Sequence, residues 1–409
     1  MKVCAITTWP PHRDGLALYS AKLYACVAKL ANVKVVTNTV SGLTSGTDKE
    51  INNITIVRCW KRGNPLYVLQ ILNRVLKSRA DIVHVQHGWL LYGGVLSSTL
   101  FPLLLFFLWV CHKRVIVTMH TVIRREAFTY GSFLVNQLAR TTTFLVTRML
   151  ASFSSRLVVH NKLMESVLLT EFGLRKDKAI IIPHGVAKAE IGFEAEHERK
   201  EGLQILSLGF LREKKKLEHL IEAFQRVLKQ HPNARLVIIG ERHAHDDASY
   251  ATKLKLLVSN SNIGTQVMFA DFVTEDALDE FISASDVIVL LSGERGYVET
   301  SGALARVADF EKPVICSKVP KFQGELSDGN DCVMVEPNNS EHLSKAINLM
   351  LENLNLRKNL ALNLKTKFSP RYWDTVAKKH LELYTCVLTN SYSHNMDTGQ
   401  YATKSCYCL

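Results

Sequence analysis

The sequence predicts an α/β protein that consists of two Rossmann-like halves. Short runs rich in β-branched residues alternate with segments of helical period along the chain, a pattern typical of parallel sheets whose strands are joined by helices. The 409 residues exceed what one ordinary core accommodates and suffice for two. A polar stretch rich in Glu, Lys and Arg, residues 187–202, separates two series of strands and predicts an inter-domain linker.

The expected strands fall into these two series. In the first half they are residues 2–8, 33–37, 54–58, 81–86, 114–119, 156–160 and 179–183, and in the second half 204–209, 234–240, 266–270, 286–291, 313–317 and 332–335. The clearest helix follows residue 216, with apolar residues at helical spacing: Leu217, Leu220, Ile221, Phe224, Val227 and Leu228. An earlier helix is expected to bury Leu16, Leu23, Val27 and Leu30 on one face.

The chain is accordingly divided into four parts. We expect one domain over residues 1–187, a second over 203–370, a last helix over 371–388 and a polar, disordered tail over 389–409. The tail ends in Cys406-Tyr407-Cys408-Leu409, which formally matches a prenylation box.

The charge of the chain is distributed unevenly. The formal net charge is +12, of which residues 1–190 contribute +15 and the remainder −3. Such asymmetry indicates that the first half meets an anionic substrate or surface, a membrane among them. Nucleic acid is not expected, because neither a basic helix nor an aromatic-basic sheet pattern is present. The nine cysteines are scattered and no secretory signal precedes them, which favours a cytoplasmic setting.

One segment is unusually apolar. Residues 89–111 contain no charge and end at His112-Lys113-Arg114, and their length approaches the roughly 20 residues that span a bilayer. They also contain paired glycines and Pro102, and they lie between two expected strands of one sheet. We therefore expect a buried helix or a shallow contact with the inner face of the membrane rather than a spanning helix.

Candidate site residues follow the strands, because ligands bind outside the carboxyl ends of parallel strands. Gly15 stands at a helix start, where a phosphate can approach free N–H groups, although no GxGxxG pattern is present. His120 follows the strand 114–119 and could hydrogen-bond a sugar or a phosphate. Isolated histidines are more often structural, and the same alternative applies to His84, His87 and His184.

Two loops of the second half are richer in polar residues. Gly209 to Lys216 includes Arg212 and Lys215 at a helix mouth, where cations and the helix dipole can neutralise a diphosphate. A solvated charge run is the alternative. The loop after residue 291 contains Glu294 and the run Glu299-Thr300-Ser301-Gly302, whose carboxylates could bind sugar hydroxyls and whose helix start could bind phosphate; a surface loop with an N-cap is the alternative.

The order of these features resembles the retaining glycosyltransferases of the GT-B fold, in particular glycosyltransferase family 4. The matching stretches cover nearly the whole chain except the tail: Asp14-Gly15, Val117 to His120, Ile182 to Val186, Leu208 through Phe224, Lys312 to Ile315, and Arg371-Tyr372-Trp373 through Tyr384. The resemblance implies two Rossmann-like domains that face each other across a cleft. The first would bind the acceptor and the second the nucleotide sugar, and the helix 371–388 would cross back to the first.

The resemblance also implies roles for single residues. Gly15 and Gly209 would lie against the donor diphosphate, Lys215 would bind it and Arg212 would add charge, although the family's arginine corresponds to Phe210. His120 would line the pocket of the transferred sugar. Glu294 would act in catalysis, and the donor would be bound by Glu299, Thr300, Ser301 and Gly302.

The chain departs from the family at its paired glutamates. Counting back from Lys312 puts Val298 and Arg306 where the two glutamates, eight residues apart, belong. The implied activity is transfer of a hexose from a nucleotide diphosphate sugar to a hydroxyl of a glycan or lipid-linked acceptor, with retention and without a metal or cofactor. Because the glutamates are missing, an inactive scaffold that binds nucleotide or glycan stays open, as does a GT-B epimerase or phosphorylase.

Overall fold

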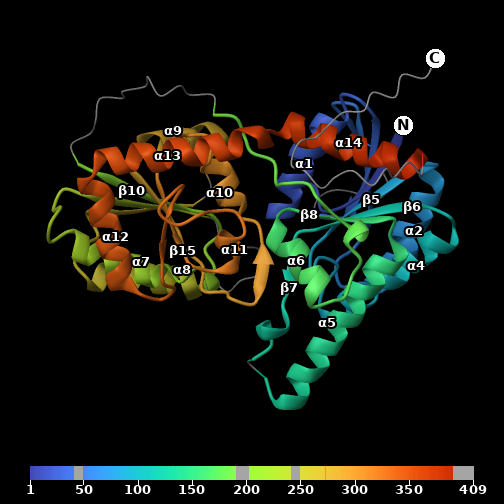
Figure 1. The fold of residues 1–409 in the computed structure, drawn as a ribbon, viewed down its shortest axis with the longest axis horizontal. Coiled ribbons are helices and arrows are strands. Elements are labelled where there is room, and N and C mark those ends of the chain that lie inside the picture. The colour runs from blue at the N-terminus through green and yellow to red at the C-terminus, as the bar shows by residue number, and fades with distance from the viewer. Residues whose placement is uncertain (41–48, 130, 190–201, 241–248, 272, 390–409) are drawn as a thin grey trace.

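The computed structural model describes residues 1–40, 49–129, 131–189, 202–240, 249–271 and 273–389. Most of the expected linker and the whole tail after residue 389, with its prenylation box, lie outside these ranges. The described chain forms two α/β halves that lie side by side, each built on its own sheet (Figure 1).

The first half contains an eight-stranded sheet in the order β3-β4-β2-β1-β5-β6-β8-β9, parallel except for the antiparallel β3–β4 pair. Its strands are β1 (Lys2–Ile6), β2 (Asn32–Asn38), β3 (Lys49–Ile51), β4 (Ile54–Trp60), β5 (Ile82–His87), β6 (Arg114–Met119), β8 (Arg156–Val159) and β9 (Ala179–Ile181). Its helices are α1 (Gly15–Val27), α2 (Tyr67–Ser78), α3 (Val95–Thr99), α4 (Phe101–Val110), α5 (Phe133–Phe153) and α6 (Lys162–Thr170).

The second half contains a six-stranded parallel sheet in the order β12-β11-β10-β13-β15-β16. Its strands are β10 (Gln204–Leu208), β11 (Arg235–Ile239), β12 (Val267–Ala270), β13 (Val287–Leu290), β15 (Val314–Ser317) and β16 (Val333–Val335). Its helices are α7 (Leu217–Val227), α8 (Ser249–Asn260), α9 (Glu275–Ala284), α10 (Gly302–Val307), α11 (Pro320–Gln323), α12 (Ser340–Glu352) and α13 (Leu354–Phe368). Every strand expected from the sequence is present.

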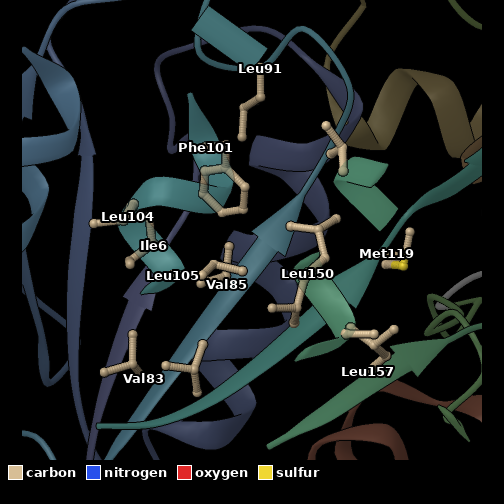
Figure 2. Packing of buried hydrophobic residues seen from close by; sticks show 14 of the residues in the cluster. Ile6, Val83, Val85, Leu91, Phe101, Leu104, Leu105, Met119, Leu150 and Leu157 are labelled. Atoms are coloured by element: carbon tan, nitrogen blue, oxygen red, sulfur yellow. The ribbon is translucent and has the colours of Figure 1, made fainter. Parts of the chain in front are cut away.

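The apolar segment 89–111 is divided between the loop after β5 and the helices α3 and α4. Figure 2 shows Phe101, Leu104 and Leu105 of α4 packed toward Val83 and Val85 of β5. Burial of each such side chain contributes about 1.5–3 kcal/mol to folding, so this segment forms part of the core. Within the described part of the chain, the structure contains no helix that combines the length and apolarity needed to cross a bilayer.

The last helix, α14 (Trp373–Thr389), crosses from the second half to the first and packs on α1 (Figure 1). Its Trp373 ring lies 5.1 Å from that of Tyr19, and the Tyr384 hydroxyl is 2.6 Å from His84 Nδ1. One expectation for α1 was wrong. The helix ends at Val27, so Leu30 lies beyond it and is 66% exposed.

The two halves also share a small antiparallel sheet that the sequence did not predict. β7 (Thr121–Ile123) of the first half pairs with β14 (Tyr297–Glu299) of the second, with Val122 opposite Val298. Both valines are buried. Next to the pair, the Arg124 N–H donates to the Gly296 carbonyl at 2.9 Å. This sheet joins the two halves directly after His120.

Candidate active site

The shared β7–β14 sheet brings together residues that follow the carboxyl ends of strands in both halves. The Thr121 hydroxyl, directly after His120, donates to Glu299 Oε2 at 3.3 Å. The other oxygen of Glu299 forms an ion pair with Lys321 at 2.7 Å and lies 3.8 Å from the Lys214 ammonium. The expected loops after β6 and β13 therefore meet at Glu299.

Glu299 is ionised in this setting. Burial alone would raise its pKa, but the charges of Lys321 and Lys214 and the hydrogen bonds from Lys321 and Thr121 outweigh burial and lower the pKa to about 2. The side chain is thus a fixed negative group between two lysines. It is positioned to accept hydrogen bonds from a ligand's hydroxyl groups.

Lys215 lies directly against Gly209 at the end of β10. Gly209 has φ +111°, a backbone conformation that favours glycine, and a Cβ there would come within 2.5 Å of the Lys215 ammonium. The ammonium donates to the Leu208 carbonyl at 2.9 Å. Burial, together with the charges of Lys321 and Lys214, lowers the pKa of Lys215 to about 7. A bound anion would compensate this poorly solvated cation.

Lys214 and Glu294 form an ion pair at 2.8 Å. Burial would lower the pKa of Lys214, yet the carboxylates of Glu299 and Glu294 outweigh burial and raise it. Arg212 begins the 3-10 turn η3 (Glu213–Lys215) and lies close enough for its charge to oppose this rise. Arg212, Lys214, Lys215 and Lys321 thus form a cationic cluster that contains two carboxylates.

Two helix starts are open to a ligand. Gly15 begins α1, whose N-cap Asp14 accepts the Ala17 N–H at 2.6 Å. Ser301 caps α10 by accepting the Leu304 N–H at 3.2 Å, and Thr300 precedes it as the link from β14. A Cβ added at Gly15 or at Gly302 would meet no atom within 4 Å, so the backbone of both glycines faces free space.

His120 belongs to a hydrogen-bonded network of the first half. Its Nε2 lies 2.8 Å from Gln86 Oε1, its Nδ1 lies 3.2 Å from His160 Nε2, and its ring packs edge-on against Tyr19. Burial, with the charges of the neighbouring histidines, lowers the pKa of His120 well below its ordinary value. The ring is therefore neutral at pH 7, and both nitrogens already have partners.

The network also defines the tautomers. His160 Nδ1 lies 3.0 Å from the Ile182 carbonyl, so it must donate its N–H there, and its Nε2 must accept from His120 Nδ1–H when both rings are neutral. His120 Nε2 is then an acceptor, which requires Gln86 to turn its amide NH2 toward it. The sequence alone does not reveal this arrangement, because Gln86 lies on β5 and His160 directly follows β8.

The other histidines have structural surroundings. His84 and His87 are buried, and burial lowers their pKa values to about 3 and about 4. His184 donates to the Gly185 carbonyl at 2.7 Å and packs against Trp373. The structural alternative considered for these three residues fits their positions.

The positions where the family has its glutamates are used differently. Val298 is the buried middle residue of β14, and Arg306 of α10 forms ion pairs with Asp279 and with Glu275 of α9, the latter at 3.3 Å. Lys321, which sequence reasoning missed, faces Glu299 instead. Its place shortly after β15 is the signal that could have identified it.

The ends of β13, β15 and β16 enclose a small cavity. It is lined by polar groups that include Ser292, Ser317 and Glu336, and its volume of about 10 Å³ is enough for one water molecule. Within the described ranges, no group of three or more His, Cys, Asp or Glu side chains is arranged to bind a metal ion.

Family models identify both halves. The glycosyltransferase family 4 model matches residues 14–190, and the model for glycosyl transferases group 1 matches residues 189–367. The chain therefore belongs to the group 1, family 4 glycosyltransferases of the GT-B fold, and it is an α/β protein with two Rossmann-like domains.

Curated relatives match part of the chain. An uncharacterized glycosyltransferase of Methanocaldococcus jannaschii, MJ1607, is 26% identical over 244 residues, 56% of this chain and 60% of the relative. The mannosylfructose-phosphate synthase of Agrobacterium fabrum is 25% identical over 43% of this chain and 40% of the relative. The chain thus spans between two fifths and three fifths of the length of these relatives.

Solved structures match nearly the whole chain. Sucrose-phosphate synthase from Thermosynechococcus elongatus has a TM-score of 0.75 at 16% identity, covering 96% of this chain and 100% of that one. Anabaena HepE in complex with UDP-glucose has a TM-score of 0.72 at 13% identity, covering 94% and 99%. At these identities the likeness shows the shared fold alone.

Proposed function

We propose that this glycosyltransferase moves a hexose from a nucleotide diphosphate sugar to a hydroxyl of a glycan or lipid-linked acceptor, with retention of configuration. The observation that supports this most is the partly buried Lys215, whose ammonium lies against Gly209 with Lys214 and Lys321 nearby. A poorly solvated cluster of cations at the carboxyl ends of strands matches the charge of a departing diphosphate.

The leaving group would be stabilised electrostatically. Lys215 and Arg212 would donate to the phosphate oxygens, and the open backbones at Gly15 and Gly302 would add N–H groups of two helix starts. Ser301 and Thr300 border the second of these starts. These groups act without a metal ion or cofactor, so we propose that the reaction is metal-independent.

The sugar would lie between His120 and the carboxylates. Glu299 is ionised and would accept hydrogen bonds from sugar or ribose hydroxyls, and Glu294 would do the same once a donor competes for Lys214. His120 would border the sugar with its ring edge, because its nitrogens are engaged with Gln86 and His160. In this proposal the donor phosphate accepts the acceptor's proton, so no protein nucleophile is needed.

The acceptor is proposed from charge. Residues 1–190 have a net charge of +15, which favours an anionic or membrane-bound acceptor at the inner face of the membrane over a neutral sugar. Mannosylfructose-phosphate synthase and sucrose-phosphate synthase, by their names, make phosphorylated sugars. Their likeness supports an acceptor that contains a sugar.

Lys215→Ala tests the proposal directly. Loss of this ammonium should lower kcat/KM at least about tenfold, measured as nucleoside diphosphate release with a panel of sugar nucleotides. Lys345→Ala, which removes an exposed lysine paired with Glu341, is the matched control and should react like the parent. Near-parental turnover of Lys215→Ala would contradict the assigned role.

A second candidate function is favoured by Val298 and Arg306. Since neither supplies a carboxylate, a scaffold that binds nucleotide or glycan without transfer is the alternative. Tight donor binding without turnover across the panel would favour this scaffold. Formation of an epimer of the donor, or release of a sugar phosphate from a glycan and phosphate, would instead favour an epimerase or a phosphorylase.

A further inference from the structure

Helix α5 has its apolar residues on both sides. Its buried residues, Thr143, Val146, Thr147, Leu150 and Ala151, all belong to its second half, which packs beside α4. At about 100° per residue, Leu134, Leu138, Leu145 and Met149 fall within about 60° of one another on the opposite side. A surface helix normally has polar or charged residues there.

This outer stripe is exposed over the length of the helix. Leu134 and Leu138 are 77% and 69% exposed, and Leu145 and Met149 are 53% and 40% exposed. Phe133, beside the stripe, is 76% exposed. Exposed apolar residues in isolation are ordinary, but a continuous patch marks a surface that binds a partner.

The first half of α5 extends away from the rest of the domain. None of the described residues from Phe133 to Thr142 is buried. Figure 1 shows this end of the helix at the lower edge of the molecule, beyond the sheet and the other helices. The described part of the chain therefore offers no internal packing reason for the apolar stripe.

The apolar surface continues onto α4. Trp109 and Val110, at its end, are 54% and 49% exposed, and the Trp109 ring lies 5.9 Å from that of Phe153 at the end of α5. Tryptophan beside aliphatic residues is typical of the boundary between lipid headgroups and acyl chains. The stripe of α5 and this end of α4 are together called the docking face.

The charge around the docking face is positive. Residues 101–153 contain six Lys and Arg but one acidic residue, and α5 contains Arg140 and Arg148 and no acidic residue. The hydrogen bonds of Arg140 go to the carbonyls of Arg125 and Phe128, and those of Arg148 to the carbonyls of Phe172 and Gly173. At the same angle per residue, Arg148 lies beside the stripe and Arg140 on the far side of the helix. Among the described residues, neither arginine forms an ion pair with a carboxylate.

We propose that the docking face binds an anionic lipid bilayer. Leu134 and Leu138 would enter the boundary of the acyl region, while Arg148, which lies beside the stripe, would meet anionic headgroups. Charge disfavours a second copy of the chain as the occupant, because a symmetric contact would bring Arg148 close to its own counterpart. The sequence predicted a shallow membrane contact from the segment 89–111. The contact proposed here lies mainly on α5, which comes later in the chain.

The position of α5 relates docking to catalysis. The helix follows β7, which pairs with β14 of the second half, and the 3-10 turn η1 (Arg125–Ala127). This step rests on the proposed function: docking through α5 would bring the candidate active site next to an acceptor in the membrane surface. The docking itself does not depend on transfer and is tested separately.

Co-sedimentation with vesicles tests the docking face. The full chain should bind vesicles of phosphatidylcholine with phosphatidylglycerol, bind vesicles of phosphatidylcholine alone far more weakly, and dissociate at high salt. The double variant Leu134→Glu, Leu138→Glu should lose binding at least about tenfold. The control Leu256→Glu, Leu362→Glu, at positions 57% and 56% exposed on the second half, should bind like the parent.

Three results would overturn the proposal. In the first, the parent does not bind anionic vesicles. In the second, the α5 variant binds them as tightly as the parent. In the third, light scattering shows a concentration-dependent dimer of the parent that the α5 variant does not form. Transfer to a water-soluble acceptor is measured in parallel and should be equal in parent and variants. Loss of transfer in every protein would contradict the proposed function but leave the vesicle result as an independent test of docking.

Discussion

Lys215 couples the candidate site to pH. Its pKa of about 7 without ligand means that the ammonium loses its proton as the pH rises through neutrality. A diphosphate beside it would raise this pKa, so donor binding above pH 7 should take up a proton. Donor affinity should fall by up to about tenfold per pH unit above pH 7 until the pKa of the bound state is reached.

Calorimetry measures this proton uptake. At pH 8 the observed enthalpy of donor binding should depend on the ionisation enthalpy of the buffer. Lys215→Arg keeps a charge that does not titrate in this range and should remove the dependence. Buffer-independent enthalpies for the parent would show that Lys215 does not change protonation on binding.

At the scale of elements, the contact between β14 and the first half sets how closely the two halves approach. A Cβ at Gly296 would lie 2.3 Å from the Cα of Ala127, so Gly296→Ala cannot keep the present approach of the two halves. We expect this variant to have a larger radius of gyration in small-angle scattering and a kcat/KM lowered about tenfold or more, because closure excludes water and completes the site.

Gly264→Ala is the matched control for this experiment. A Cβ at Gly264 would meet no atom within 4 Å, so both its scattering and its turnover should equal those of the parent. An unchanged radius of gyration in Gly296→Ala, with and without donor, would contradict the role assigned to the β7–β14 sheet.

The attachment of α14 to the first half should be sensitive to acid. His380 of α14 is buried beside His84, and its two ring nitrogens have no hydrogen-bond partner within the described residues. Burial lowers the pKa of His380 well below its ordinary value and that of His84 to about 3. The unfolded chain therefore binds more protons below about pH 6.5, and the free energy of unfolding falls as the pH falls.

Urea unfolding at pH 7.5 and pH 5.5 measures this effect. Each histidine that stays neutral in the fold should lower the free energy of unfolding by up to about 1.4 kcal/mol per pH unit below 6.5. His380→Phe should reduce this pH dependence, whereas the exposed His112→Phe should not change it. An identical pH dependence in parent and His380→Phe would contradict the explanation.

At the scale of the whole molecule, the alternation of strand-like and helix-like segments predicted the two sheets and the helices that connect their strands. Most strands of the two large sheets are runs rich in β-branched residues, and the loops after β10 and β13 followed from the position rule for ligands. β7 and β14 have three residues each, too short for any alternation to be recognised. Their pairing depends on the approach of two domains, which local sequence does not specify.

Contacts between residues far apart in sequence also explain which site residues the sequence did not reveal. Lys321 lies 22 residues after its partner Glu299, on a helix that showed no special pattern. His120 was found because it follows β6 directly, and Lys215 because it lies in the loop between β10 and α7. The partners of His120, Gln86 and His160, are 34 and 40 residues away in sequence and meet it only in the folded sheet.

The central claim is that the cleft transfers a hexose from a nucleotide diphosphate sugar. NMR of a reaction with donor and sugar acceptor tests it most directly, because it follows nucleoside diphosphate, glycoside and anomeric configuration together. The account predicts diphosphate and glycoside in equal amounts, with the anomeric configuration of the donor retained. Diphosphate release without glycoside, an inverted product, or donor binding without either product would contradict it.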